Sequence, residues 1–436
     1  MNNSLYSWGR YPSIVQTGNF CEWQSEVSGR IAQISKIHGS TLPYGNGRSY
    51  GDSCLAASDH VLQLRSLGRF IKVDWKKGTV LAEAGVTLKE ILAVSIPQGW
   101  FLTVTPGTQF VTLGGAVAND VHGKNHHLRG TFGNHVLRFG LVRQGETMTC
   151  SPSENSDLYA ASIGGLGLTG VITWVEIQLM SITASQIDYR IVRFENLAEF
   201  FTLSSQLDQL HEYSVAWIDC LARGEQLGRG VFMVGDHARY GSLDVCEGKK
   251  LWVPFTPPLS LVNKLSLRAF NELYWRAHPT VSTRVRCDYE PFFYPLDRVL
   301  YWNRIYGRRG FQQYQCVIPE AASEAAMGEL LKAIARSGEG SFLAVLKRCG
   351  NVASPGLMSF PLSGTSLALD FPQKASLISL FARMDAIVRE SGGRLYAAKD
   401  AHMSGSDFRQ AYPSWEQLEA LRDRSLMSRF WKRVSL

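Results

Sequence analysis

The chain has 436 residues, too many for one ordinary hydrophobic core, and its content of 45% hydrophobic and 19% charged residues is typical of a globular protein. The net charge of +7 comes from lysines and arginines spread along the chain, which argues against a nucleic-acid-binding protein, where they gather in a stripe or arm. This mild basic excess suits a phosphorylated substrate or an anionic membrane surface.

Strands and short helices alternate with glycine-rich turns over about the first 180 residues. Hydrophobic spacing predicts helices over 22–35, 88–95 and 157–162, and strands over 61–67, 70–75, 79–84, 137–143, 146–150 and 173–180. Thr87 and Glu90 have the spacing of a capping box at the start of the second helix. We therefore expect an α+β cofactor-binding domain over residues 1–184.

Longer β-rich segments and helices follow, without glycine clusters. Strands are predicted over 186–194, 213–222, 229–235, 313–318, 342–347 and 366–371, and helices over 197–210, 322–337 and 374–391. We expect a second α+β domain around an antiparallel sheet over residues 185–393. Gly392-Gly393 then interrupts the chain, and a segment over 394–436 is expected to return to the first domain. The aromatic segments 255–275 and 287–302 are expected to pack mainly in the core, with exposed lids for a lipid chain as the alternative.

The eight cysteines are scattered, and none forms a CxxC pair or lies near histidines with metal-ligand spacing. In a chain of this length, that spacing favours reduced, mostly buried thiols and a cytoplasmic protein. The N-terminus has no apolar signal core, and no window approaches the apolar length of a spanning helix. We expect a cytoplasmic protein, with peripheral contact to the inner face of the cell membrane left open.

Three glycine clusters, at 43–53, 105–140 and 163–172, carry the strongest functional signal. The phosphate-binding P-loop, HExxH, GxSxG and strand–GxGxxG–helix patterns are all missing, so a Rossmann dinucleotide site is not expected. Successive backbone amides in tight turns bind anions, and three clusters in one domain suit a long ligand with a central pyrophosphate. His122 and His126 have the spacing of a helical metal pair, but flanking glycine and the lack of a nearby carboxylate ligand argue against a metal site.

These clusters resemble the flavin domain of the vanillyl-alcohol-oxidase superfamily. VHGKNHH at 121–127 followed by GTFGNHV at 130–136 is most similar to one branch, the decaprenylphosphoryl-β-D-ribose 2'-oxidases of arabinan biosynthesis. Further similar segments lie in order along nearly the whole chain: 8–10, 213–219, 227–229, 293–297, 302–304, 313–315 and 395–400. The resemblance implies a two-domain α+β flavoprotein of that superfamily's fold.

The resemblance also implies an activity. FAD would oxidise the ribose 2'-hydroxyl of a polyprenyl-phosphoryl-β-D-ribose to a ketone, the first half of an epimerisation to the arabinose donor of the cell wall. A separate NAD(P)H-dependent short-chain reductase would then reduce the keto product. Two alternatives stay open: an alditol or aldonolactone oxidase of the same fold, and a flavin-binding partner subunit without turnover.

The resemblance assigns cofactor and substrate roles to specific residues. The residues expected to bind FAD are Tyr44, Gly45, Asn46, Gly47, Arg48, Ser49, Tyr50, Gly51, Asp52, Ser53, Gly107, Thr112, Leu113, Gly114, Gly115, Asn119, Asp120, Val121, His122, Ile172 and Tyr396. The residues expected to bind substrate are Lys124, Gln313, Gln315, Lys347, Asn303 and Arg304.

Three residues are expected to be catalytic: Lys399, His122 and Tyr50. A cation beside the flavin stabilises the negative charge that develops when an alcohol is oxidised, and Lys399 is our candidate. The hydroxyl proton needs an acceptor or relay, and all three residues remain candidates for it. Tyr50 stands about where many flavin oxidases of the superfamily carry a histidine bonded covalently to the cofactor, so we expect non-covalent FAD.

Ala368 marks a departure from the mycobacterial members, which have a cysteine at this position, two residues before the aspartate of a DFP motif. That thiol has no obvious part in hydride transfer, so substrate oxidation should survive its absence. Covalent inhibition through the thiol should not occur in this chain.

Overall fold

The computed structural model describes residues 4–245 and 248–435. Cys246, one of the eight predicted thiols, lies outside these residues, and the other seven cysteines are free. Within the described residues, no helix is long and apolar enough to cross a bilayer.

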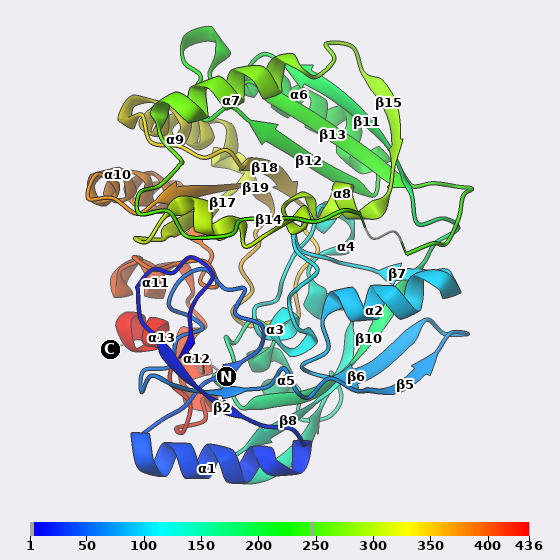
Figure 1. Ribbon diagram of the computed structural model, residues 1–436, viewed down its shortest axis with the longest axis vertical. Helices are drawn as coiled ribbons and strands as arrows, with labels where there is room; N and C mark the ends of the chain where they lie inside the picture. The colour runs from blue at the N-terminus through cyan, green and yellow to red at the C-terminus, as the bar shows by residue number, and fades with distance from the viewer. Residues whose placement is uncertain (1–3, 246–247, 436) are drawn as a thin grey trace.

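The N-terminal part of the chain forms two sheets (Figure 1). The smaller has the order β1-β2-β4-β3, with β1 at Ser4–Leu5, β2 at Gln16–Phe20, β4 at His60–Gln63 and β3 at Pro43–Tyr44. The larger has the order β5-β6-β10-β8-β9, with β7 also paired to β10. Its strands are β5 Phe70–Asp74, β6 Thr79–Glu83, β7 Trp100–Leu102, β8 Val136–Arg143, β9 Glu146–Cys150 and β10 Val171–Ser181. The two predicted hairpins are confirmed, because β5 pairs with β6 and β8 with β9, both antiparallel.

Short helices connect these strands. They are α1 Val27–His38, α2 Leu88–Ser95, α3 Leu113–Ala118, α4 His126–Arg129 and α5 Ser156–Ser162. The predicted capping box of α2 is confirmed: the Thr87 amide donates to Glu90 Oε2 at 2.7 Å, and the Glu90 amide donates to Thr87 Oγ1 at 3.3 Å. These two bonds satisfy backbone groups that a helix N-terminus leaves free.

An eight-stranded antiparallel sheet dominates the other half of the molecule, at the top of Figure 1. Its order is β15-β11-β13-β12-β18-β19-β17-β20. The strands are β11 Ile187–Phe194, β12 Tyr213–Ile218, β13 Gly230–His237, β15 Thr283–Cys287, β17 Phe311–Pro319, β18 Ala344–Cys349, β19 Gly364–Pro372 and β20 Arg394–Leu395. Helices α6 Leu197–Leu207, α9 Ser323–Ser337 and α10 Leu377–Glu390 pack against it and against each other. The fold is therefore the expected two-domain α+β arrangement, while the boundaries after residues 184 and 393 stay a prediction.

The two faces of this sheet have different surroundings. Side chains alternate between the faces of a strand, so residues two apart share a face. On β17, Tyr314 and Cys316 belong to the hydrophobic core, whereas Gln313 and Gln315 line a cavity. One face of the sheet therefore packs in the core, and the other forms the floor of a cavity that faces the N-terminal half.

The C-terminal helices lie against the N-terminal strands, beside the blue segment in Figure 1. They are α11 Gly405–Ala411, α12 Trp415–Leu421 and α13 Arg429–Ser435. Two isolated bridges fix the contact, Thr41 with Leu426 and Ala56 with Ser428. Trp431 and Phe430 of α13 are fully buried, so this return of the chain is held by packing as well as by backbone bonds.

The prediction that segment 255–275 lies mainly in the core is wrong for much of it. Strand β14 (Leu251–Trp252), helix α7 (Lys264–Arg276) and the segment between them leave large apolar side chains 59–79% exposed. These are Leu251, Trp252, Phe255, Leu259, Leu261, Leu265 and Leu273. Helical periodicity was obeyed, since Leu267 and Trp275 are buried, but it cannot say that the remaining apolar positions also face solvent.

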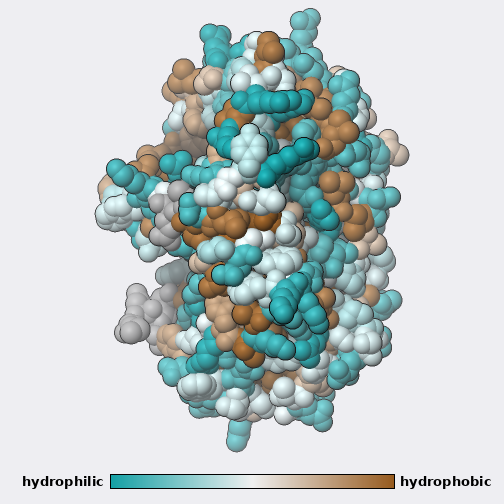
Figure 2. All heavy atoms as spheres, turned by 90° about the vertical axis from the view of Figure 1, so that its right-hand side faces the viewer, coloured by the Kyte–Doolittle hydropathy of each residue, from teal (hydrophilic) through white to brown (hydrophobic). Residues whose placement is uncertain are grey.

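The second aromatic segment, 287–302, is largely buried as predicted. It forms α8 (Tyr289–Phe293) and β16 (Val299–Leu300), and β16 pairs with β14 in parallel. Phe293 and Tyr294 are 1% and 0% exposed, whereas Tyr301 is 50% exposed. The face in Figure 2 is mostly hydrophilic, with separate hydrophobic patches, one of them at mid-height.

Candidate active site

A cavity of about 470 Å³ lies between the glycine clusters and the floor of the eight-stranded sheet. This volume is in the range of small-molecule sites. Most predicted cofactor residues line it: Tyr44, Gly45, Asn46, Gly47, Arg48, Ser49, Tyr50, Ser53, Gly107, Thr112, Gly114, Gly115, Asn119, Val121, His122, Ile172 and Tyr396. The predicted substrate residues Lys124, Gln313, Gln315 and Lys347 line the same cavity, as does Lys399. The structure thus brings together residues that are up to 355 positions apart, from Tyr44 to Lys399.

The cofactor side of the cavity is shaped for close approach of a ligand to the backbone. Gly47 has φ +59°, and a Cβ there would lie 2.0 Å from the Tyr44 hydroxyl oxygen. Only glycine fits this turn without strain. Ser53 Oγ, also at the cavity, is buried and has no hydrogen-bond partner among the described residues. A narrow glycine-lined turn with an unused hydroxyl fits the phosphates and ribose of FAD, because these groups accept and donate hydrogen bonds.

The C-terminal segment closes this side. The Tyr396 hydroxyl donates to the Asn119 carbonyl at 2.7 Å, so the loop after β20 is attached to the loop after α3. Tyr396 is 6% exposed and stacks on Phe360, with ring centroids 4.6 Å apart. These contacts place the segment that carries Lys399 directly over the cofactor loops.

Six predicted site residues do not line the cavity: Gly51, Asp52, Leu113, Asp120, Asn303 and Arg304. Leu113 is fully buried in the hydrophobic core. Asp120 binds the loops instead, accepting bonds from the Gly133 amide at 2.8 Å and the Ser354 and Ser359 hydroxyls at 2.6 and 2.5 Å. A motif places a loop near a ligand, but it does not give the direction of each side chain.

The two residues predicted from 302–304 have structural contacts. The Asn303 amide donates to the Trp8 carbonyl at 3.0 Å. The Arg304 guanidinium donates to the carbonyls of Val253 and Pro254 at 2.8 and 2.9 Å. Arg304 therefore anchors the exposed apolar segment next to the cavity, and Trp302 rather than Asn303 faces the cavity.

Three lysines give the cavity a positive character. Lys347 of β18 donates to the Gly123 carbonyl at 2.8 Å, and burial lowers the pKa of Lys347 to about 8. Burial, with a smaller contribution from Lys347, lowers the pKa of Lys124 to about 8 as well. In the described part of the chain, neither lysine forms an ion pair with a carboxylate. Buried charges normally have partners, so this arrangement points to an anionic ligand.

Lys399, the third lysine, lies against Tyr50. The Lys399 ammonium lies 3.7 Å from the centroid of the Tyr50 ring. Burial lowers the pKa of Lys399, and the nearby Asp370 carboxylate opposes this shift. Burial raises the pKa of the Tyr50 hydroxyl well above its usual value, which makes Tyr50 a poor base at neutral pH.

His122 is the remaining catalytic candidate. Its Nε2 lies 3.0 Å from Gln315 Nε2, while its Nδ1 is buried with no partner among the described residues. Burial lowers the pKa of His122 well below its usual value, and Lys347, His126 and Lys399 lower it further. The imidazole is therefore neutral at pH 7, and because the Gln315 amide nitrogen can only donate, His122 Nε2 is the acceptor and Nδ1 carries the ring proton. His127 Nε2 lies 3.0 Å from the His211 carbonyl, a contact that braces this loop.

Asp370 was missed from the candidate residues. It is 1% exposed, and Gln313 Nε2 donates to its Oδ1 at 2.7 Å. Burial raises the pKa of this carboxyl to about 7, against the opposing effects of the Gln313 hydrogen bond and the nearby Lys399 ammonium. Its position on β19 was the available signal, because Ser366, Ala368 and Asp370 share a strand face and the first two line the cavity.

The fold and this site define a two-domain α+β flavoprotein. Residues 20–151 match a family described as FAD binding domain, which covers the first two glycine clusters. The chain is 35% identical over 425 residues to decaprenylphosphoryl-beta-D-ribose oxidase of Mycolicibacterium smegmatis, covering 94% of this chain and 91% of that protein. This chain belongs to the decaprenylphosphoryl-β-D-ribose oxidase family.

Two other relatives differ in extent. An uncharacterized protein in the mprA 5'region of Streptomyces coelicolor is 32% identical over 352 residues, covering 77% of this chain and 95% of that protein. The L-gulonolactone oxidase of Mus musculus is 30% identical over 138 residues, only 31% of this chain and 30% of that protein. The lactone oxidase is therefore similar over a limited part of the chain, whereas the family relationship extends over nearly all of it.

Proposed function

We propose that this protein oxidises the ribose 2'-hydroxyl of a polyprenyl-phosphoryl-β-D-ribose to the 2'-keto product. The observation that carries this proposal is the cavity itself, lined by cofactor loops and by two lysines, Lys124 and Lys347, that form no ion pair with a carboxylate in the described part of the chain. The relationship to the Mycolicibacterium oxidase supports it, because that relationship includes the second half of the chain. Bound FAD would accept the hydride that leaves the sugar carbon.

The residues of the floor would bind the anionic sugar. Lys124 and Lys347 present two ammonium groups to the cavity, and both remain mostly protonated at pH 7 because each pKa is about 8. Charge-assisted hydrogen bonds to phosphate are about twice as strong as neutral ones. Gln315, next to His122, would hold a sugar hydroxyl and thereby orient it.

Proton removal would involve His122. Tyr50 is unsuited because its own proton is held tightly, and Lys399 serves better as a cation close to the developing negative charge. His122 is neutral and lies on the cavity wall, and its Nε2, which accepts a bond from Gln315, is the nitrogen with a lone pair for a proton. We therefore propose His122 as the acceptor of the hydroxyl proton.

FAD would be bound without a covalent link. Tyr50 stands about where a histidine with a covalent flavin bond would be expected. Its ring packs against Lys399 and, edge to face, against Phe311, with the ring centroids 5.4 Å apart. Precipitating the protein with acid should therefore release yellow flavin into the supernatant. Flavin that stays with the pellet would contradict this proposal and favour the alditol or lactone oxidases.

The exposed apolar segment would contact the lipid. Its strand β14 pairs with β16, and Val299 and Leu300 of β16 line the cavity, so the segment lies at the cavity edge. Exposed basic residues, including Lys249, Lys264 and Arg268, accompany the apolar ones. Together they suit an anionic membrane surface that delivers a polyprenyl chain. We propose peripheral binding at the inner face of the membrane, and a short-chain reductase that takes up the keto product.

Vesicle sedimentation tests the membrane contact. A Trp252→Gln, Phe255→Gln double variant should lose most binding to vesicles of phosphatidylglycerol and phosphatidylcholine. Ile37→Gln is the matched control, because Ile37 is 66% exposed on α1, at the bottom of Figure 1, whereas α7 lies at the top. Equal binding by all three proteins would place the lipid contact elsewhere.

An anaerobic titration tests the reaction. Polyprenyl-phosphoryl-β-D-ribose should bleach the flavin absorbance of the purified protein, while L-gulono-1,4-lactone and xylitol should leave it unchanged. Bleaching by the lactone or alditol alone would refute the lipid-linked substrate. If none of them bleaches the flavin, and Lys399→Ala behaves as wild type does because there is no activity to lose, the protein would instead be a flavin-binding subunit without turnover.

A further inference from the structure

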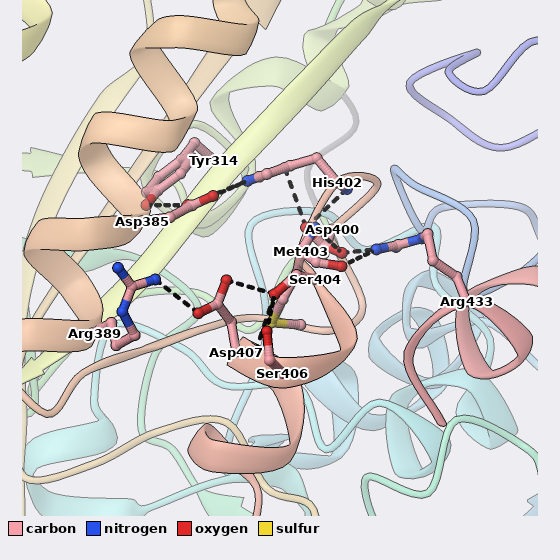
Figure 3. A network of polar contacts seen from close by, with 10 residues as sticks. All are labelled: Tyr314, Asp385, Arg389, Asp400, His402, Met403, Ser404, Ser406, Asp407 and Arg433. Carbon is pink, nitrogen blue, oxygen red and sulfur yellow. Dashed lines mark hydrogen bonds and ion pairs between the residues drawn. The ribbon is translucent and has the colours of Figure 1, made fainter. Parts of the chain in front are cut away.

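A buried polar network lies behind the active site, on the side opposite the cavity. It joins the C-terminal helices to the loop that carries Tyr50 and to the strand that carries Gln313 and Gln315 (Figure 3). We propose that Arg433, on α13, is a positioning residue that holds Tyr50 and Lys399 against each other by binding the carboxylates of Asp52 and Asp400. The kinetic consequence of this inference rests on the proposed function, whereas the position of Lys399 does not.

The chain segments 50–52 and 399–400 run side by side. The Asp52 amide donates to the Asp400 carbonyl at 3.3 Å. A Cβ on Gly51 would lie 1.7 Å from that carbonyl oxygen, so the backbones touch and only glycine fits between them. At the cavity end of this contact, the Lys399 ammonium lies over the Tyr50 ring at 3.7 Å. The separation of these segments therefore sets the position of Lys399.

The same contact brings two carboxylates together. Asp52 and Asp400 are 5% and 3% exposed, and burial, together with the nearby Asp400 carboxylate, raises the pKa of Asp52 because like charges repel in a poorly solvated place. Without a cation, this repulsion would separate the two segments. A backbone bond of 3.3 Å is a weak restraint against it.

Arg433 supplies that cation. Its Nε and Nη2 donate to the two Asp52 oxygens at 3.0 and 2.9 Å, and Nη2 also donates to Asp400 Oδ2 at 2.8 Å. Its Nη1 donates to the Met403 carbonyl. A planar guanidinium can make all these bonds at once, whereas an ammonium cannot match the paired geometry. Figure 3 shows Arg433 and His402 reaching the Asp400 turn from different directions.

The other side of Asp400 is tied to the sheet. His402 Nδ1 lies 3.2 Å from Asp400 Oδ1, and its Nε2 lies 3.2 Å from Asp385 Oδ2. The Tyr314 hydroxyl donates to Asp385 Oδ1 at 2.9 Å, and Tyr314 stands between Gln313 and Gln315 on β17. Arg433 thus completes a chain of contacts from the C-terminal helix to the cavity floor.

Arg429 provides a matched control on the same helix. It donates through Nε and Nη2 to Asp59 Oδ1 at 3.2 and 2.7 Å, and it contacts neither Asp52 nor Asp400. Its side chain is 33% exposed, close to the 27% of Arg433. Arg429→Met therefore removes a similar ion pair from α13 and leaves the bonds from Arg433 to Asp52 and Asp400 in place.

The experiment measures the reactivity of Lys399 directly, in the purified protein with its cofactor. Trace labelling with acetic anhydride at a series of pH values, followed by peptide mass spectrometry, gives the apparent pKa of Lys399. We expect Arg433→Met to move that midpoint upward by about one pH unit, because a displaced ammonium is better hydrated. Arg429→Met should leave it unchanged, and Arg433→Lys should fall in between.

Steady-state kinetics supply the second readout. Arg433→Met should lower kcat on the order of 10- to 100-fold with little change in KM, since Lys399 is misplaced relative to the reacting atoms while the lysines of the floor are untouched. Arg433→Lys should recover part of kcat. If Arg433→Met does not fold, Arg433→Lys carries the test, with a smaller shift of the Lys399 midpoint in the same direction.

The results separate the two proposals. A folded Arg433→Met protein whose Lys399 labels with the wild-type midpoint overturns the positioning role, whatever the substrate is. A shifted midpoint in a protein that no polyprenyl-phosphoryl-ribose reduces would retain the positioning role and overturn the proposed substrate.

Discussion

Replacing Lys347 by methionine should raise stability and weaken substrate binding at the same time. Lys347 is 9% exposed, and burial lowers its pKa from 10.5 to about 8. At pH 7 this corresponds to about 3 kcal/mol by which the fold disfavours the charged lysine. Loss of the bond to the Gly123 carbonyl would offset about 1–2 kcal/mol. We expect Lys347→Met to gain about 1–2 kcal/mol in free energy of unfolding.

The gain should depend on pH in a defined direction. A lysine with a lowered folded pKa destabilises the fold fully below that pKa, and the penalty fades as pH rises toward the unfolded value. The advantage of Lys347→Met over wild type should therefore be largest below about pH 8 and disappear before pH 10.5, where the charge penalty is gone and the lost Gly123 bond favours wild type. Urea unfolding at pH 7, 9 and 10.5 measures it, and Lys36→Met, at an exposed lysine, should show no such trend.

Substrate binding should change in the opposite sense. One charge-assisted bond to phosphate contributes about 1.5–3 kcal/mol, so KM for the lipid-linked sugar should rise about 10- to 150-fold. Lys347→Met with an unchanged KM would refute the idea that the floor lysines bind the substrate anion. A variant less stable than wild type at pH 7 would refute the view that Lys347 is costly without a ligand.

Three further predictions follow from the cavity. Gly51→Ala should destabilise the protein by about 3 kcal/mol or more because its Cβ would meet the Asp400 carbonyl, whereas Gly107→Ala, where a Cβ meets nothing within 4 Å, should change the free energy of unfolding by less than about 0.5 kcal/mol in thermal or urea unfolding. Ala368→Cys should place a thiol in the cavity that iodoacetamide alkylates and substrate protects; labelling indifferent to substrate would put position 368 outside the site. His122→Ala should lower kcat about 10²- to 10⁴-fold, and the wild-type pH profile should show no acid limb near pH 6.5, because the pKa of His122 lies well below that value; a limb at 6.5 would contradict this assignment.

The fold could be predicted from the sequence wherever local chemistry decides the structure. The hairpin at 70–84 and the capping box of Thr87 and Glu90 depend on neighbouring residues alone, and both are present. The helix at 322–337 was also visible, since its apolar spacing is regular. The exposed segment at 251–273 was not, because apolar periodicity predicts a buried face and carries no information about a partner outside the chain.

The same distinction applies to the site. Motifs located Tyr50, His122 and Lys399, and the structure brings them to one cavity. They did not show that Asp120 faces its own loops, nor that Arg304 anchors a neighbouring segment, because side-chain direction depends on distant contacts. Arg433 shows the same limit more strongly, since its partners Asp52 and Asp400 are 381 and 33 positions away.

The charges of this cavity make sense only with a ligand present. Lys347 is buried, Lys124 and Lys399 are half-buried, and desolvation lowers the pKa of each. Such groups weaken a fold, so their presence indicates that binding of an anion recovers the loss. Arg433, by contrast, neutralises two carboxylates that the fold itself brings together, which strengthens the structure without any ligand. The two sets of charges therefore have different roles. The cations that face the cavity would bind substrate and cofactor, and Arg433 behind the cavity holds Lys399 in the position from which it would contact them.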